Sequence, residues 1–327
     1  MKGFKHLALC AMISIVACGC QLPDPKELHD AIRAGDQAKV KSLVSQNARV
    51  VNARDKAGNT AMHHAVATGN AAMVDLLLAS KAAVNDRNGL DQTPLYRAVS
   101  MNNQPVIKLI LAQKPDVHGK DRLGNTLLHV AAQKANQELV QWLLANKADV
   151  EAKNNFGKTP LVLAVQARQG AVVPEILIKH GANVNWVDQN GGTLLHFTAG
   201  EGDKGLLELF LDQKLDVNLR DQSGNTPLHY AAYAGKMSVV ESLIAHQADV
   251  RALNNGKLTP AQFAEQPPSM ALVGAMPGGG TAATPAAAPT GATGTGPTAA
   301  KNAIPQIKSH RAEEVVKYLK KLEAGGK

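Results

Sequence analysis

Apolar residues recur along the chain in two kinds of short segment, separated by polar turns. One kind follows a threonine, as in Thr126-Leu-Leu-His-Val-Ala-Ala, and the next carries a stripe such as Val140, Leu143 and Leu144. Spacings of three and four residues bring side chains onto one face of a helix. The pattern therefore predicts pairs of short amphipathic helices, repeated between residues 26 and 266.

The segments that begin with threonine recur at a nearly constant interval. Their first residues lie 33, 33, 33, 34, 33 and 33 positions apart. A threonine can accept hydrogen bonds from the free amides at a helix start, and four of the seven are followed by proline, which suits the first helical position. The seven are Thr60, Thr93, Thr126, Thr159, Thr193, Thr226 and Thr259.

Small side chains occur five residues after these threonines, where they allow neighbouring helices to approach closely. Thr198 is the one departure from alanine at this position. The alanines are Ala65, Ala98, Ala131, Ala164, Ala231 and Ala264.

The period and the Thr-Pro-Leu-His motif resemble the ankyrin repeat. The resemblance covers roughly residues 26–266 and implies an all-α solenoid of about eight helix-turn-helix repeats with short β-hairpin fingers. Asp-x-x-Gly turns, such as Asp121 to Gly124, would form the fingers. A single repeat cannot enclose its own apolar face, so stability is expected to come from stacking.

Both ends of the predicted array differ from the repeats. Residues 26–46 predict a helix pair without the threonine motif, and residues 267–303, rich in Pro, Ala, Gly and Thr, predict a disordered segment. Residues 304–327 contain an amphipathic helix at 309–323, whose Val315 and Leu319 imitate the stripe of a second helix. Our hypothesis is that this helix completes the last repeat and closes the stack; a free tail helix is the alternative.

The N-terminus predicts export. Lys2 and Lys5 precede an apolar run that ends at Ala17, which is the pattern of a signal peptide over residues 1–17. Residues 15–18, Ile-Val-Ala-Cys, resemble the bacterial lipobox, in which the cysteine carries the lipid. Cys18 is therefore the predicted lipidation site, with Cys20 as the alternative, and residues 18–25 would form a tether.

The lipobox resemblance also implies a location. Neither Gly19 nor Gln21, the residues after the two candidate cysteines, is Asp, so default sorting would give an outer-membrane lipoprotein that faces the periplasm. Ordinary cleavage after Gly19 would instead give a soluble periplasmic protein.

Composition and charge narrow the function classes. Aromatic residues form only 3% of the chain, which argues against an aromatic-cored β-sandwich. The whole chain has a net charge of +8, but residues 18–300 contain only two more basic than acidic residues. A basic groove for nucleic acid is therefore not expected. All three cysteines lie in the first twenty residues, so the repeats contain neither a disulfide nor a cysteine zinc site.

Histidine recurs at one position of the repeat, as His63, His129, His196 and His229. The family resemblance implies that this histidine ties adjacent hairpins by hydrogen bonds, rather than serving catalysis or metal binding. The neighbouring His64 adds little, because adjacent helical residues point apart. No nucleophile elbow, phosphate loop or metalloprotease motif occurs in the sequence. We therefore predict no enzyme activity, no cofactor and no metal.

The resemblance implies a binding surface for another protein at the finger tips and the exposed ends of the first helices. Three successive tips, three residues before their threonines, are apolar: Leu90, Leu123 and Phe156. They are a candidate contact site, although isolated apolar surface residues are common. Trp186 and Tyr233 are two further candidates, with partial burial between repeats as the alternative.

Basic residues stand six positions before five of the threonines. They could steer an acidic partner, or they could belong to ordinary solvated fingers. The five are Arg54, Arg87, Lys120, Lys153 and Arg220.

Together these features predict a non-catalytic, monomeric protein-protein interaction module, anchored by lipid in the bacterial envelope. A narrower hypothesis is that it inhibits or protects a periplasmic or secreted enzyme. A structural tether that recruits envelope proteins through the linker and the C-terminal helix is the alternative.

Overall fold

A computed structural model of the chain describes residues 24–266 and 310–325. The predicted signal peptide, Cys18, Cys20 and the segment 267–303 lie outside the described residues. Within the described part, no helix combines the length and the hydropathy needed to cross a membrane. The chain divides into two compact units, which are described separately below.

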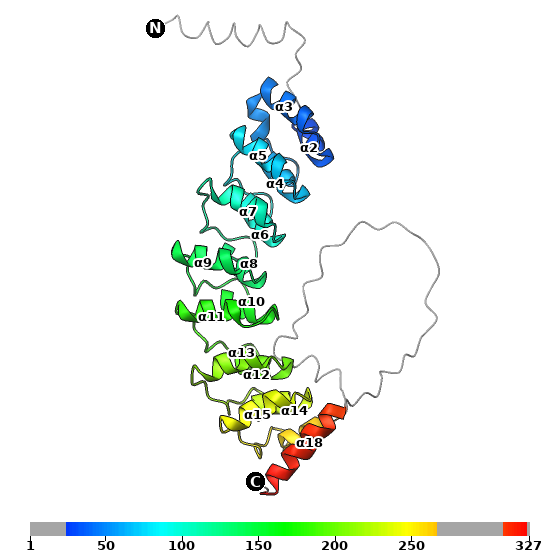
Figure 1. The fold of residues 1–327 in the computed structure, drawn as a ribbon, viewed down its shortest axis with the longest axis vertical. Coiled ribbons are helices and arrows are strands. Elements are labelled where there is room, and N and C mark those ends of the chain that lie inside the picture. The colour runs from blue at the N-terminus through cyan, green and yellow to red at the C-terminus, as the bar shows by residue number, and fades with distance from the viewer. Residues whose placement is uncertain (1–23, 267–309, 326–327) are drawn as a thin grey trace, which may run out of the picture. The chain divides into compact units, whose positions relative to one another are not determined.

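The N-terminal unit consists of residues 24–136 with the short segments 146–148 and 153–157. Its first helices, α2, α4, α6 and α8, pack on one another in order, and its second helices, α3, α5 and α7, form a parallel layer (Figure 1). The elements are α2 (Pro25–Ala34), α3 (Gln37–Gln46), η1 (Ala48–Asn52), α4 (Ala61–Thr68), α5 (Ala71–Ala79), α6 (Pro94–Ser100), α7 (Gln104–Leu111) and α8 (Leu127–Gln133).

The C-terminal unit holds the remaining described residues. Helices α10, α12, α14 and α16 pack in order, and α9 packs on α11 as α13 does on α15. The elements are α9 (Gln137–Ala145), α10 (Pro160–Gln166), α11 (Val172–Lys179), α12 (Leu194–Glu201), α13 (Lys204–Leu211), α14 (Pro227–Tyr233), α15 (Met237–Ala245), α16 (Pro260–Ala264) and α18 (His310–Glu323). The described part is therefore an all-α repeat solenoid, as predicted.

The repeated threonines stand at the N-caps of the first helices as predicted, although the hydroxyl of Thr159 makes no capping bond. In four repeats the threonine and the histidine three residues later form a reciprocal capping box. In the repeat of Thr226, for example, the backbone N–H of Thr226 donates to Nδ1 of His229 over 3.1 Å. These bonds satisfy helix-end amides that would otherwise lack a partner.

Close packing of the first helices requires the small residue at the fifth position. Ala65, Ala98 and Ala231 are fully buried there. Thr198, the departure from alanine, is also fully buried, and its hydroxyl donates to the carbonyl of Leu194 over 3.0 Å. This local bond satisfies the hydroxyl, so the solenoid tolerates a polar residue at this position.

The fingers differ from the expected β-hairpins. Among the described residues they form only isolated antiparallel bridges, Lys120 to Thr126 and Val187 to Thr193, and no strand. The returning arm ends at the bridge itself, because α8 begins directly after Thr126 and α12 directly after Thr193, which leaves no residue to extend the pairing into a ladder. The solenoid is therefore all-α with turn-like fingers.

The helix pair at the N-terminus is confirmed as α2 and α3. Helix α2 begins at Pro25, and Asp24 caps it by accepting from the backbone N–H of Lys26 over 2.9 Å. The fold therefore starts two residues before the predicted boundary at 26, inside the segment that we predicted as a tether.

Helix α18 packs against α14, α15 and α16 (Figure 1). Val315 and Leu319 of its apolar stripe are fully buried, while Lys317 and Lys321 on its other side are exposed. Lys320 Nζ lies 2.5 Å from Glu265 Oε1, and Arg251 donates to the carbonyl of Glu323. This packing is what a capping helix requires. That α18 is the displaced second helix of the last repeat remains our interpretation.

Candidate interaction surface

Three successive finger tips of the N-terminal unit expose large apolar side chains. Leu90 is 52% exposed, Leu123 is 51% exposed and Phe156 is 67% exposed. We call these three residues the apolar row. The corresponding tips of the C-terminal unit include Asn190 and Ser223, which are polar and exposed. Large apolar side chains exposed on successive tips are unfavourable in water, so the apolar row is the best candidate contact site.

Backbone hydrogen bonds between neighbouring fingers hold the row in register. The carbonyl of Leu90 accepts from the N–H of Arg122 over 3.2 Å, and that of Leu123 accepts from the N–H of Asn155 over 2.9 Å. Gly124 has a φ of +77°, and a Cβ on it would lie 2.8 Å from the nitrogen of Asn155, so only glycine allows this approach. The tips are therefore presented by a bonded scaffold.

Asparagine side chains add a second set of bonds between fingers, which sequence analysis did not identify. Asn88 Nδ2 donates to Asn59 Oδ1 over 3.1 Å, and Asn154 Nδ2 donates to Asn125 Oδ1 over 2.9 Å. Asn254 and Asn225 repeat this bond in the C-terminal unit at 2.9 Å. The two bonded residues are 29 positions apart, which is less than one repeat. They therefore occupy different positions in successive repeats, and the pattern of a single repeat does not reveal their contact.

The basic residues six positions before the threonines are engaged with neighbouring fingers. Arg87 donates to the carbonyl of Lys120 over 2.9 Å, and Lys120 Nζ donates to the carbonyl of Lys153 over 3.2 Å. Arg54 and Arg220 make the same type of bond to the carbonyls of Arg87 and Leu253. The structure thus gives four of the five a bond within the scaffold, and a role in steering a partner stays a prediction.

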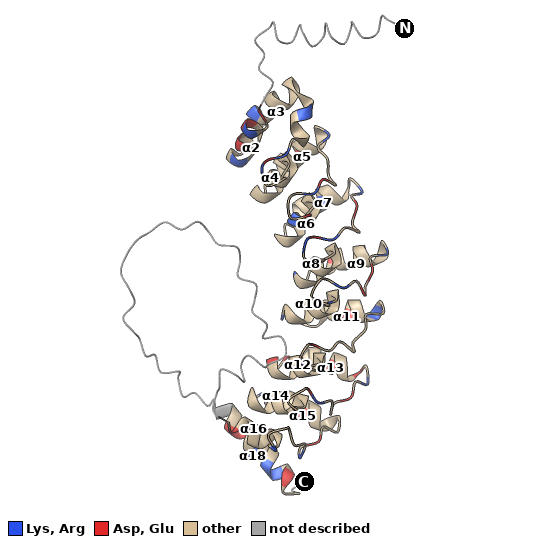
Figure 2. Cartoon of the chain, turned by 180° about the vertical axis from the view of Figure 1, so that it is seen from behind, with Lys and Arg blue, Asp and Glu red and all other residues tan. Residues whose placement is uncertain are grey.

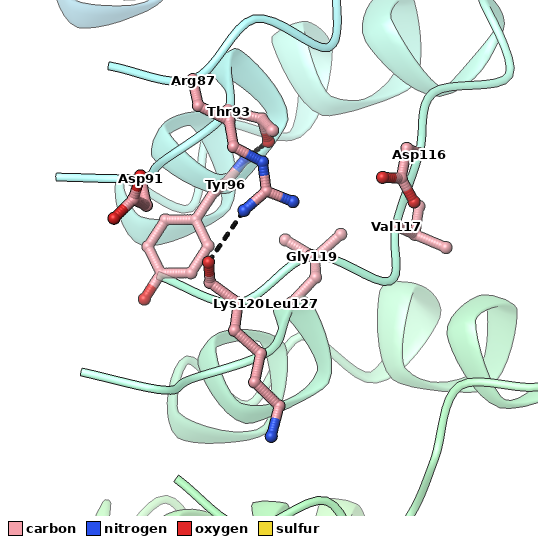
Figure 3. A pocket seen from close by; sticks show the side chains of 9 residues that line it. All are labelled: Arg87, Asp91, Thr93, Tyr96, Asp116, Val117, Gly119, Lys120 and Leu127. Carbon is pink, nitrogen blue, oxygen red and sulfur yellow. Dashed lines mark hydrogen bonds between the residues drawn. The ribbon is translucent and has the colours of Figure 1, made fainter. Parts of the chain in front are cut away.

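A small hollow lies beside the hydrogen bond from Arg87 to the carbonyl of Lys120 (Figure 3). Its volume is about 10 Å³, room for no more than one water molecule. Gly119 lines it, and a Cβ there would lie 1.9 Å from the guanidinium of Arg87. A side chain at position 119 would therefore displace the guanidinium of Arg87 from this place, and the hollow is too small to bind a ligand.

The two other aromatic candidates are half-buried. The ring of Tyr233 packs on Phe263, with centroids 5.6 Å apart, and burial raises the pKa of its phenol. Trp186 is also of intermediate exposure. Both side chains therefore remain partly accessible, and a role in binding a partner stays a prediction for each.

The repeated histidines tie adjacent repeats, as the family resemblance implied. Nε2 of His63 bonds to the carbonyl of Gln92 over 2.9 Å, that of His196 to Asn225 over 3.0 Å, and that of His229 to Leu258 over 3.1 Å. Burial lowers the pKa of all three rings, that of His229 to about 4. The bonds to backbone carbonyls favour the charged form and oppose this shift, but burial has the larger effect. These rings are neutral structural links at neutral pH.

Charge is mixed on both units. Basic and acidic residues are interspersed along the fingers and helices (Figure 2). This interspersed distribution agrees with the small charge difference between residues 18 and 300.

Comparison with known families decides the assignment of the fold. Residues 28–121, 113–188 and 167–254 match a family model described as ankyrin repeats in three copies. The chain belongs to the ankyrin-repeat family. Ankyrin repeats are protein-protein interaction modules and are typically non-catalytic, which fits the bonded fingers and their exposed tips. No curated protein matches the chain.

Proposed function

We propose that this ankyrin-repeat protein is a non-catalytic, lipid-anchored binding protein of the bacterial envelope that holds a partner protein on its apolar row. The observation that carries the proposal is the half or greater exposure of Leu90, Leu123 and Phe156 on fingers that are hydrogen-bonded to one another. A rigid apolar surface loses little entropy on binding and gains from desolvation. Large apolar and aromatic anchors of this kind commonly dominate interface energetics.

The narrower proposal is that the partner is a periplasmic or secreted enzyme, which the monomeric chain inhibits or protects by covering its active site. The lipid, on Cys18 or Cys20, would keep the complex at the outer membrane, facing the periplasm. A structural tether that recruits through α18 is less well supported. The apolar stripe of that helix, with Val315 and Leu319, is already buried against the repeats.

Replacing Leu123 and Phe156 by serine is expected to abolish capture of the partner without unfolding the protein. Loss of two interface anchors at about 2 kcal/mol each weakens binding by about a thousandfold. Exposed side chains contribute little to folding, so the free energy of unfolding should change by less than about 0.5 kcal/mol per substitution. The measurement is crosslinking in the native envelope followed by mass spectrometry.

The matched control is Leu253→Ser, which removes an apolar side chain of similar exposure, 48%, that is not one of the three residues of the row. It should capture the partner like the unchanged protein. Equal capture by the double variant and the unchanged protein would exclude the apolar row as the contact site. Fatty-acid labelling of Cys18→Ser and Cys20→Ser variants separately tests the anchor, because only one of them should lose the label.

A further inference from the structure

His29, Asp55 and His64 converge at the start of the N-terminal unit, although they come from three different elements. His29 lies on α2, Asp55 in the first finger turn and His64 on α4. One ligand atom from each residue can be chosen such that all three lie within 4.8 Å of one another. The rings of His29 and His64 are tilted by 39°, with centroids 4.6 Å apart. We call these residues the histidine-aspartate cluster.

His29 carries a buried ring nitrogen without a partner. The residue is only 1% exposed, and its Nε2 has no hydrogen bond. A neutral histidine carries its proton on Nδ1 or on Nε2, and the tautomer with the proton on Nδ1 leaves the lone pair of Nε2 free to ligate a metal. A buried acceptor without a donor is costly unless another species satisfies it.

The two other members supply further lone pairs beside this nitrogen. His64 Nε2 lies 2.9 Å from Asp55 Oδ2. Asp55 is held in place because its Oδ1 accepts from the backbone N–H groups of Ala57 and Asn59, both over 2.8 Å. The side chains of His64 and Asp55 remain 14% and 24% exposed, so an ion and a water ligand can reach the cluster from solvent.

We propose that His29, Asp55 and His64 bind a late first-row divalent cation such as Zn²⁺, through Nε2, a carboxylate oxygen and Nε2, with water as the fourth ligand. On binding, the Nε2 proton of His64 moves to its Nδ1, which frees Nε2 for the ion. Ligand atoms around tetrahedral zinc lie about 3.3 Å apart. The cluster therefore needs to contract by about 1.5 Å at most, a movement within reach of side-chain rotation.

The ion would fasten the helix pair α2 and α3 to the first repeat with the threonine motif. The prediction of no metal rested on the repeated histidines, of which His63, His196 and His229 bond to carbonyls. His29 and His64 lie outside that repeated position. The nearby positive charges are Arg33, which pairs with Asp30 over 2.8 Å, and Arg97; both act on His64.

The test is titration of the chelator-treated full chain with Zn²⁺ by calorimetry. We expect one ion per chain, and a rise in melting temperature that follows zinc concentration. His64→Ala should weaken binding by at least about tenfold, because even loss of a residue that supports a ligand has that effect. Asp55→Asn is the second variant: its remaining oxygen can still accept the bonds from Ala57 and Asn59. His118→Ala removes an exposed histidine outside the cluster and should bind like the unchanged chain.

Cobalt(II) gives a readout that does not depend on any variant. The cluster should give intense visible bands of four-coordinate cobalt with nitrogen and oxygen ligands, without a sulfur charge-transfer band. Such a sulfur band would place the ion on the N-terminal cysteines and overturn the proposal. So would the absence of saturable zinc binding, unchanged binding by both His64→Ala and Asp55→Asn, or displacement of zinc by equal amounts of Mg²⁺.

Discussion

Deleting residues 304–327, and with them helix α18, is expected to destabilise the C-terminal unit by about 3 kcal/mol or more. Val315 and Leu319 are fully buried, and burying one such side chain is worth about 1.5–3 kcal/mol. The deletion also exposes the faces of α14, α15 and α16 that α18 covers. Repeat arrays depend on end caps because each repeat is stabilised only by its neighbours. Thermal unfolding followed by circular dichroism measures the loss.

Point variants of α18 sharpen this test. Leu319→Ala should cost about 2–5 kcal/mol, the usual range for a buried leucine. Lys317→Ala on the exposed side of the same helix should change stability by less than about 0.5 kcal/mol. Equal melting temperatures for the deletion, Leu319→Ala and the unchanged chain would show that α18 does not cap the array.

Lowering the pH from 7.5 to 4 is expected to destabilise the protein through its buried histidines. The pKa of His229 is about 4 in the folded protein, against 6.5 for a free histidine, because the ring is buried. Between these values the unfolded chain binds the proton and the folded chain does not. Stability is therefore complete above about pH 7 and falls as the pH drops through 6.5 towards 4. His229 alone contributes about 3 kcal/mol to this loss.

The capping box adds to this effect of burial. Nδ1 of His229 accepts from the backbone N–H of Thr226 over 3.1 Å, and a protonated nitrogen cannot accept. The pKa values of His63 and His196 are also lowered by burial, so they act in the same direction. Urea unfolding at a series of pH values measures the slope.

The last repeat supplies a matched variant for the pH experiment. There Gln262 stands at the histidine position, and its Oε1 accepts from the N–H of Thr259 over 3.0 Å. His229→Gln should therefore keep the cap, lose the bond to Leu258 and be somewhat less stable at pH 7.5. Its stability should decline less steeply with acid. An unchanged slope would mean that His229 does not contribute to the pH dependence.

The sequence predicted those features that recur with the repeat. The threonine caps, the small fifth residue and the histidine links each appear several times at one spacing, so chance resemblance is excluded. The position of α18 followed from the match between its stripe, with Val315, and that of α15. The exposure of Leu123 followed from its place at a turn.

Other features depend on contacts that no single repeat reveals. The bond from Arg87 to the carbonyl of Lys120 involves a main-chain atom, which leaves no trace in the residue types. His29 and His64 meet once, at the end of the array, so no period points to their contact. The fingers lack strands because backbone pairing depends on arm length, which the turn motif does not specify.

The backbone bonds between fingers do not depend on which side chains stand at the tips of the apolar row. The carbonyls of Leu90 and Leu123 hold the neighbouring finger, and every residue type carries the same carbonyl. A new side chain at either tip therefore alters what the protein recognises while leaving the support beneath it intact. The chain can thus be retargeted by exchanging a few tip residues, in natural drift or in a designed library, without rebuilding the repeats.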